Sequence, residues 1–454
     1  MSIQPRSQIP VVPYVMLFST LALIAGVIVY LSHSTTTEEA LRGDKNIIPL
    51  NGPWRFVTGD NMQYAQPEYD DSGWETMDLA APPGAHDDDV GLSGFVPGWT
   101  SKGYPNYSGY AWYRLTVPSD GLPGNDLALA GPPAVDDSYQ LYVNGSLLGG
   151  VGDFSGPVPT IYSIQPRVFV LPENAKNERN ITIAFRVWMS PAGLAADAGG
   201  IHVAPALGEK SRIERKYRFQ WEQTIKGYIV EVVLPAMFGL LAITMLLLKI
   251  SGKLKRSCRW FITALALLGL LRLNQAVYFW FHIENVYQAT ILGSAVIRPM
   301  MLGSWLMAWW QWFDLERPKW LPKVIGSVVL LYMAIQLVGL FWTTNPAIHA
   351  YYPAIIDYLR LLLLASMLFI ICGRIRKNGT KDPLVLLAVV LLTIGVFPQE
   401  VSKLNVIPGI WFPFGVGVSR GQFCYAAFVL VMYMSLINSY ALGRDNGATM
   451  SPTL

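Results

Sequence analysis

The chain has 454 residues and a formal net charge of +3, and its charged side chains make up 14% of the sequence, where soluble proteins carry about 25%. Apolar residues make up 52%, and the mean hydropathy is +0.33. A water-soluble fold cannot bury so much apolar surface, so we expect much of the chain to lie in lipid. The composition also excludes a disordered chain, and the low cysteine content excludes a disulfide scaffold.

The first long apolar run, Val11–Leu31, contains no charged residue and is long enough to cross a hydrocarbon core of about 30 Å. It is longer than the apolar part of a typical cleaved signal peptide, and no clear small-residue cleavage site follows it. We therefore expect residues 1–32 to form a cytoplasmic N-terminus and an uncleaved transmembrane anchor. A cleaved signal peptide is the alternative.

Residues 33–207 are predicted to form an external all-β domain, because short apolar runs alternate there with Gly, Pro and Asp. The runs that predict strands are Ala111–Val117, Asp126–Ala130, Tyr139–Val143, Leu147–Gly150, Arg167–Leu171 and Asn180–Val187. Asn144-Gly145 predicts a type I′ hairpin turn, since both residues tolerate positive φ. This pattern favours a sandwich or jelly roll. An excess of Asp and Glu disfavours nucleic acid as a partner.

Five short motifs follow one another in this region. They are Trp54-Arg55-Phe56, Tyr69-Asp70-Asp71-Ser72-Gly73-Trp74-Glu75, Gly109-Tyr110-Ala111-Trp112-Tyr113-Arg114, Asp136-Asp137-Ser138-Tyr139 and Val143-Asn144-Gly145. Together they resemble the galactose-binding-like jelly roll at the N-terminus of family 2 glycoside hydrolases. The resemblance implies binding of a sugar or small ligand without hydrolysis, because the catalytic carboxylates of those enzymes lie in a separate barrel.

Most of the matched residues are expected to be structural rather than ligand-binding. This group consists of Trp54, Trp74, Trp112, Tyr113, Arg114, Asp136 and Asn144. Arg114 and Asp136 are candidates for a buried ion pair that braces the sheet.

The candidate ligand-binding aromatic residues lie in the irregular stretch Pro82–Tyr110. Trp99, Tyr104, Tyr107 and Tyr110 are separated by Gly and Pro, so a single strand cannot bury all four. An aromatic ring can stack on the apolar face of a sugar. The alternative is a loop that folds over the sandwich and packs its own aromatic side chains.

An acidic cluster, His86-Asp87-Asp88-Asp89, lies in the same stretch. Asp87 and Asp89 are candidates for bonding ligand hydroxyl groups, and the cluster is a candidate for a structural calcium ion. A solvated acidic loop is the alternative, because the spacing does not match an EF-hand. No other cofactor or metal is expected.

The segment 208–228 is predicted to be a linker helix, because it has no Pro and no Gly between Gly208 and Gly227. Residues 229–442 then contain seven further apolar runs, each expected to be a transmembrane helix. The runs are Ile229–Leu248, Trp260–Phe281, Ile291–Phe313, Val324–Trp342, Pro353–Cys372, Pro383–Phe397 and Gln422–Leu442. Residues 443–454 are expected to be a short cytoplasmic tail.

Basic residues set the expected orientation. They concentrate in the loops Lys249–Arg259, Asp314–Lys323 and Gly373–Asp382, whereas the alternate loops hold only Lys403 and Arg420. The positive-inside rule places the three basic loops in the cytoplasm. We therefore expect a multi-pass protein of a bacterial inner membrane with both termini cytoplasmic and residues 33–228 outside.

Polar side chains within membrane spans suggest function by default, since they are costly in lipid. The candidates are Arg272, Asn274, Arg298, Asp357, Arg360 and Glu400. One interpretation is that these side chains stabilise contacts between helices. The other is that they line a path for a ligand or an ion. The runs show no internal repeat of the kind that many transporters have.

The whole architecture, with the segment Trp411-Phe412-Pro413-Phe414-Gly415 and the following Ser419-Arg420, resembles bacterial seven-transmembrane receptors with diverse intracellular signalling modules. Such receptors usually continue into a phosphatase, cyclase or kinase module. The residues after Leu442 are too few for such a module, so the resemblance implies an output in trans or one encoded elsewhere, and no enzymatic activity is expected of the chain.

The sequence thus predicts a membrane receptor or sensor. An external jelly roll binds a carbohydrate or other small ligand, and seven helices pass the signal to a cytoplasmic signalling protein. One alternative is a transporter or channel with an external capture domain. A second is a membrane-bound carbohydrate-active enzyme, for which the external region lacks a convincing nucleophile–base pair. The expected partners are the ligand, the lipid bilayer and the signalling protein.

Overall fold

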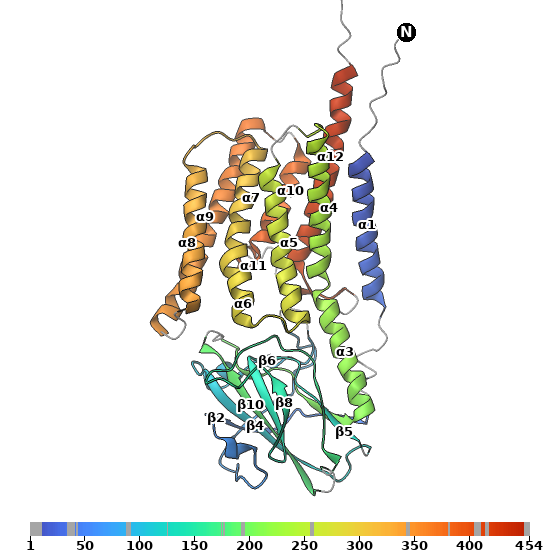
Figure 1. Cartoon of the computed structure of the whole chain (residues 1–454), viewed down its shortest axis with the longest axis vertical. Helices are drawn as coiled ribbons and strands as arrows, with labels where there is room; N and C mark the ends of the chain where they lie inside the picture. The colour runs from blue at the N-terminus through green and yellow to red at the C-terminus, as the bar shows by residue number, and fades with distance from the viewer. Residues whose placement is uncertain are drawn as a thin grey trace, which may run out of the picture.

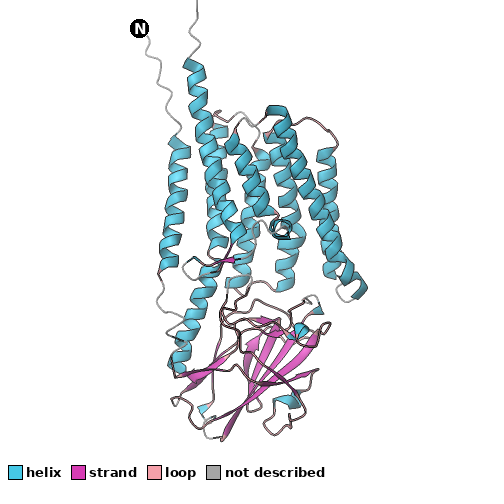
Figure 2. Cartoon of the chain, turned by 180° about the vertical axis from the view of Figure 1, so that it is seen from behind, coloured by secondary structure: helices cyan, strands magenta, loops and turns pink. Residues whose placement is uncertain are grey.

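The computed structural model describes residues 11–33, 41, 44–87, 92–124, 126–173, 175, 178–191, 196–254, 258–341, 346–379, 382–403, 410–413 and 417–448. A domain of β-strands lies against one end of a bundle of long helices, and helix α3 (Lys210–Tyr228) runs along the side of the β domain into the bundle (Figure 1). Figure 2 shows the β domain and the helical bundle from behind.

Two antiparallel sheets form the β domain. One has the order β1-β12-β5-β9 and the other the order β3-β2-β4-β10-β7-β8. The strands are β1 (Ile47–Pro49), β2 (Trp54–Thr58), β3 (Glu75–Met77), β4 (Gly109–Pro118), β5 (Leu127–Ala130), β7 (Ser138–Val143), β8 (Ser146–Val151), β9 (Val168–Val170), β10 (Asn180–Met189) and β12 (Ala206–Glu209). The two-residue strands β6 (Val135–Asp136) and β11 (Gly200–Ile201) pair separately. All six strands predicted from the sequence are present.

The core of the β domain lies between the two sheets. Alternate residues of β10 point into it, among them Ile183, Phe185 and Val187, and Leu129 and Leu207 enter from the smaller sheet. This is the period of two that a half-buried strand imposes. Because side chains of both sheets share one buried cluster, the domain is a β-sandwich.

The predicted hairpin turn is confirmed. Asn144 and Gly145 connect β7 to β8 with φ values of 47° and 80°, the left-handed region that a type I′ turn requires. The Asn144 side-chain oxygen also accepts a hydrogen bond from the backbone N–H of Thr182 at 2.8 Å. The turn is thereby fixed to the neighbouring strand β10.

The predicted linker helix is also confirmed as α3, which continues almost directly into α4 (Val230–Ile250). The remaining long helices are α1 (Val11–Ser32), α5 (Arg259–Trp280), α7 (Arg298–Trp312), α8 (Leu321–Phe341), α9 (Pro346–Asn378) and α12 (Arg420–Ala448). Helix α7 is preceded by α6 (Val286–Thr290) and by the π-helical segment η5 (Ile291–Ile297). Among the described residues, seven helical segments are long and apolar enough to cross a membrane.

An eighth apolar helix, α10 (Pro383–Val396), is shorter than the others, as the short apolar run in the sequence predicted. It is followed by the short helix α11 (Pro398–Lys403) and by the small hairpin of β13 (Ile410–Trp411) and β14 (Val418–Ser419). Helix α11 lies within the height of the bundle rather than beyond its end (Figure 1).

The sandwich lies at the end of the bundle where α4 begins and α5 ends, and the basic segments between α4 and α5, α7 and α8, and α9 and α10 lie at the opposite end (Figure 1). This separation is the arrangement that the predicted orientation requires.

Candidate ligand site between the sandwich and the bundle

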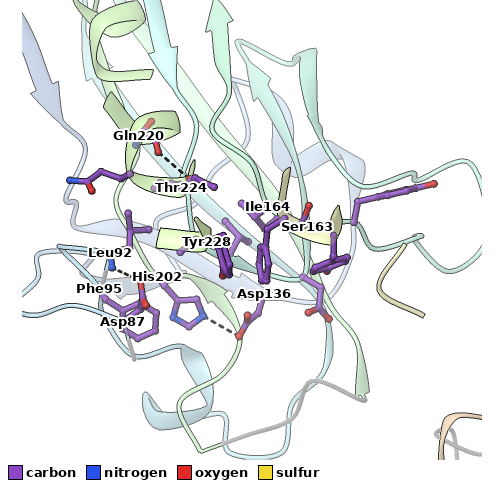
Figure 3. Close-up of a pocket in the computed structure, with 18 of the residues that line it drawn as sticks. Asp87, Leu92, Phe95, Asp136, Ser163, Ile164, His202, Gln220, Thr224 and Tyr228 are labelled. Carbon is purple, nitrogen blue, oxygen red and sulfur yellow. Dashed lines mark hydrogen bonds and ion pairs between the residues drawn. The ribbon is translucent and has the colours of Figure 1, made fainter. Parts of the chain in front are cut away.

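A cavity of about 510 Å³ lies where the sandwich, α3 and the bundle meet. Loops of the sandwich contribute Phe95 and His202, strand β6 contributes Asp136, and α3 contributes Thr224 and Tyr228 (Figure 3). The end of α5 contributes Tyr278 and Phe279. The volume falls in the range of about 300–1,000 Å³ that small-molecule pockets occupy.

His202 and Asp136 form the polar centre of the cavity wall. The Nε2 atom of His202 lies 3.0 Å from Asp136 Oδ2, and its Nδ1 atom lies 2.9 Å from the carbonyl oxygen of Val96. Both partners are acceptors, so both ring nitrogens must carry a proton to be satisfied. The ring also stacks on Phe95, with centroids 4.7 Å apart. The contacts therefore favour an imidazolium ion.

Electrostatics agree with this protonation state. Burial would lower the pKa of His202, but the hydrogen bond to Asp136 and its negative charge outweigh burial and raise the pKa. Burial would raise the pKa of Asp136, but the hydrogen bond with His202 and that from the Gly199 N–H, at 2.9 Å, lower it instead. Asp136 is therefore ionised beside a protonated His202.

Asp137 is the neighbouring carboxyl group and behaves differently. Burial raises the pKa of Asp137 to about 6, and the negative charge of Asp136 adds to the rise, against one hydrogen bond from the Ser190 N–H at 2.7 Å. One wall of the cavity thus holds an ionised carboxylate and a second carboxyl group that titrates near neutral pH.

The opposite wall belongs to the bundle and its linker helix. Tyr228 at the end of α3 stacks on Phe279 of α5, with centroids 4.0 Å apart. Gln165 of the sandwich donates to the Phe279 carbonyl oxygen at 3.2 Å, and the Val286 N–H donates to the Ile161 carbonyl oxygen at 2.9 Å. The cavity therefore lies beside direct hydrogen bonds between the sandwich and the bundle.

His282, in the loop between α5 and α6, strengthens the same contact. Its Nε2 atom donates to the Ser163 carbonyl oxygen at 3.1 Å, and its ring stacks on Tyr162. Burial lowers the pKa of His282, which keeps the ring neutral at pH 7. A second contact joins His86 of the sandwich to Phe412, with ring centroids 4.7 Å apart.

The chemistry of the cavity selects hydroxyl-rich or cationic molecules. Among the described residues that line it, Asp87, Asp136, Asp137 and Asp197 are acidic and His202 alone is cationic. Carboxylates accept hydrogen bonds from hydroxyl and ammonium groups, and the aromatic rings offer apolar faces. An anionic ligand would be repelled.

Of the residues predicted to bind ligand, only Asp87 lines this cavity, and Asp89 lies outside the described residues. Trp99 is fully buried in the sandwich core, where its indole N–H donates to the Tyr107 carbonyl oxygen at 3.0 Å. Tyr104 and Tyr107 pack against the same core, and Phe56 touches Trp99 and Tyr104. These contacts are those of the packed-loop alternative.

Tyr110 is the fourth predicted aromatic residue and lies apart, on β4. The Arg186 guanidinium lies 4.2 Å from the centre of its ring and forms an ion pair with Asp60 at 2.6 Å. Ligand binding by the four aromatic residues stays a prediction. Within the part of the chain that the structure describes, no group of His, Cys, Asp and Glu side chains is arranged to hold a metal ion.

The residues predicted to be structural lie in two apolar clusters. Trp54 and Tyr113 belong to the main core, and Trp74 and Trp112 pack on the outer face of the larger sheet. The predicted Arg114–Asp136 pair is wrong. Alternation along β4 places Arg114 on the outer face, where it pairs with Asp71 at 3.0 Å, while Asp136 pairs with His202.

The predicted intramembrane polar residues lie in the half of the bundle nearer the sandwich. Arg360 of α9 binds Glu400 of α11 through two hydrogen bonds of 2.6 and 2.8 Å. Arg272 of α5 pairs with Glu231 of α4 at 3.3 Å. Asn274 donates to the Ala289 carbonyl oxygen at 3.3 Å, Asp357 is partly buried on α9, and Arg298 follows η5.

The sequence did not indicate His202 or Asp137 as site residues. His202 is 66 positions from Asp136, so no local spacing connects them. Tyr228 is the last residue of the predicted linker, and Phe279 lies near the end of the apolar run Trp260–Phe281. Neither residue belongs to a recognisable motif. The cavity exists only because distant loops and three structural units meet.

No protein-family model matches the sequence, and a search of curated proteins gave no match. Solved structures do match part of the chain. They include a calcium-binding mutant of Bacteroides uniformis β-glucuronidase 2, with 22% identity, a TM-score of 0.25 and coverage of 36% of this chain and 17% of that chain. A glycosyl hydrolase family 2 member from Bacteroides cellulosilyticus matches with 16% identity, a TM-score of 0.26 and coverage of 36% and 20%.

A β-glycosidase from Bacteroides vulgatus matches with 20% identity, a TM-score of 0.24 and coverage of 36% of this chain and 20% of that chain. The match thus spans about a fifth of the length of each of these proteins. A likeness this limited carries no argument about activity, so the function has to be argued from the site.

Proposed function

We propose that the chain is a membrane receptor whose ligand binds in the cavity between the sandwich and the bundle. The observation that carries the proposal is that one cavity is lined by the sandwich, α3 and the end of α5. A ligand that contacts all three units binds best to one relative arrangement of them. Binding therefore shifts the equilibrium between arrangements of the sandwich and the bundle.

The ligand is a small hydroxyl-rich molecule, neutral or cationic, of which monosaccharides and amino sugars are the simplest class. Ionised Asp136 and the neighbouring Asp137 supply acceptors for hydroxyl groups, and Phe95 and Tyr228 supply apolar faces. The output is a change at the opposite end of the bundle, where the basic loops can dock a cytoplasmic protein or anionic lipid.

Thermal stability of the full chain in nanodiscs tests ligand binding. The probes are D-galactose, D-glucosamine and N-acetyl-D-glucosamine, and the variant Thr224→Trp fills the cavity from α3. Arg215→Trp adds the same side chain to an exposed position of the same helix and serves as the control. We expect at least one probe to raise the Tm of the wild type and of Arg215→Trp by several degrees, because it binds the folded state.

The Thr224→Trp variant should show no rise. An equal rise in this variant would place binding outside the cavity, and no rise in the wild type with any probe would contradict the proposed ligand class.

Transport is a second candidate function, favoured by the buried Arg360–Glu400 pair and by the short helix α11, which lies within the height of the bundle. Interrupted helices and intramembrane ion pairs are features of transporter binding sites. Radiolabelled sugar flux into liposomes that contain the protein measures it, and an Arg360-dependent flux would favour transport over the receptor.

A further inference from the structure

The half of the bundle nearer the sandwich contains more arginine than its carboxylates neutralise. Arg272 is paired with Glu231, and Arg360 is paired with Glu400. Glu231 also accepts a hydrogen bond from Gln422, and Arg272 donates to the Tyr425 hydroxyl at 3.4 Å. Both carboxylates are thus engaged by groups other than the third arginine, Arg298.

The side chain of Arg298 forms no hydrogen bond or ion pair with any residue that the structure describes. The electrostatic influences on it come chiefly from Tyr332, Arg360 and Arg272, and the last two carry a positive charge like its own. It lies deep among the helices, yet part of its side chain stays accessible to a water-sized probe.

Among the described residues, no carboxylate is one of the strongest charges acting on Arg298. Asp357 has an interaction of its own and is not among the strongest charges acting on Arg298. The segments 342–345, 404–409 and 414–416 contain no Asp or Glu. The permanent positive charge of Arg298 therefore lacks a counter-charge among the described residues, and an anion from outside the chain would have to supply it.

The backbone next to Arg298 departs from regular α-helix, and the sequence explains why. Pro299 has no N–H to donate to the carbonyl oxygen one turn earlier, and the preceding segment Ile291–Ile297 adopts a π-helix. The Arg298 N–H accordingly bonds to the Gly293 carbonyl oxygen, five residues back. Single π-helical turns inside helices frequently occur at functional sites, because they widen the helix and redirect its side chains.

We propose that Arg298 is the anchor of a second ligand site, inside the bundle, that binds an oxyanion: a carboxylate or a phosphate group. The guanidinium presents two parallel N–H groups that match the two oxygens of such an anion. The bound anion neutralises the positive charge of Arg298, to which the neighbouring Arg272 and Arg360 add their own. This site differs from the junction cavity, whose acidic wall repels anions, so the inference goes beyond the proposed receptor function.

The experiment compares the full chain in nanodiscs, with Tm followed by the fluorescence of its 15 tryptophans. One arm uses nanodiscs of phosphatidylcholine and adds sodium acetate or inorganic phosphate, with ionic strength kept constant by sodium chloride. The other arm uses phosphatidylglycerol nanodiscs in chloride alone. The variants are Arg298→Gln and Arg298→Lys, and Arg259→Gln removes an exposed arginine at the far end of α5 as a control.

We expect the Tm of the wild type and of Arg259→Gln to rise by several degrees in at least one arm, and that of Arg298→Gln to stay unchanged in both. Arg298→Lys, which keeps the charge but loses the two-pronged geometry, should show a smaller rise. In chloride and phosphatidylcholine, Arg298→Gln should melt above the wild type, because it lacks the unneutralised charge.

A rise in the first arm identifies a soluble anion, and a rise in the second alone identifies a lipid phosphate. Equal rises in the wild type, Arg298→Gln and Arg298→Lys would overturn the proposal, as would no rise of the wild type in either arm.

Discussion

At the scale of single residues, the cavity wall contains two carboxyl groups whose pKa values are shifted in opposite directions. Asp136 is ionised because His202 and a backbone N–H donate to it, while burial raises the pKa of Asp137 to about 6. The difference has a functional use, since an ionised carboxylate only accepts hydrogen bonds whereas a protonated one also donates. A hydroxyl group needs both kinds of partner.

The raised pKa of Asp137 predicts a pH dependence of stability. Its pKa is about 6 in the folded chain and about 3.9 in an unfolded one, so the folded state binds more protons between these values. Stability therefore falls as pH rises from about 4 to 6. Asp137→Asn removes this loss and should be more stable than the wild type above pH 6 by about 1–2 kcal/mol, after solvent screening.

Thermal unfolding at pH 4.5 and pH 7.5 measures the effect, with the exposed Asp120→Asn as the matched control. The advantage of Asp137→Asn should shrink at the lower pH. An advantage that is the same at both pH values would show that Asp137 is ionised throughout.

At the scale of elements, the longer strands could be predicted because each carries a run of apolar residues between turn signals. The hairpin at Asn144 is the strongest case, since two residues that tolerate positive φ determine it. β1, β2, β3 and β12 were not predicted, because runs of three to five residues such as Ile47–Pro49 show too little periodicity. Their positions depend on partners distant in the sequence, such as Gly208 for Ile47.

The candidate site could be predicted only in part. Asp87 was found because acidic residues cluster around it, whereas His202 and Tyr228 depend on contacts between separate units. Trp99 shows how little the sequence alone distinguishes the two interpretations of its irregular stretch. The indole ring is buried, and Gly199 and Gly200 pack directly against it, as in the packed-loop alternative.

The ion pair between α9 and α11 leads to an element-scale prediction. Arg360→Gln leaves the buried Glu400 carboxylate without its partner, which costs about 3–5 kcal/mol of stability. The double replacement Arg360→Leu with Glu400→Leu removes both charges and should recover most of that loss. Arg376→Gln, at an exposed position of α9, serves as the control.

Thermal unfolding of the wild type and the three variants in nanodiscs provides the comparison. A double variant as unstable as Arg360→Gln would mean that the two side chains do not act as a pair.

At the scale of the whole molecule, the account depends on the contact between a water-facing sandwich and a lipid-facing bundle. Their interface combines hydrogen bonds from the loop around Ile161 and Gln165 with the stacking of Tyr228 on Phe279. Helix α3 passes almost directly into α4, so the sandwich is joined without an intervening loop to a helix that is long and apolar enough to cross a membrane. The sequence indicated the two parts and their order, but nothing local in it indicated that a cavity lies between them.

Single-molecule energy transfer across the molecule tests this central claim most directly. One dye is attached to the exposed Cys372 at the far end of α9 and the other to the variant Asp120→Cys in the sandwich, while Cys258 and Cys424 are buried and stay unlabelled. The added ligand is the sugar that gives the largest Tm rise. The account predicts that this sugar shifts the distribution of transfer efficiencies in the otherwise wild-type chain and leaves it unchanged when Thr224→Trp fills the cavity. A sugar that binds the cavity and leaves the distribution unchanged would contradict it.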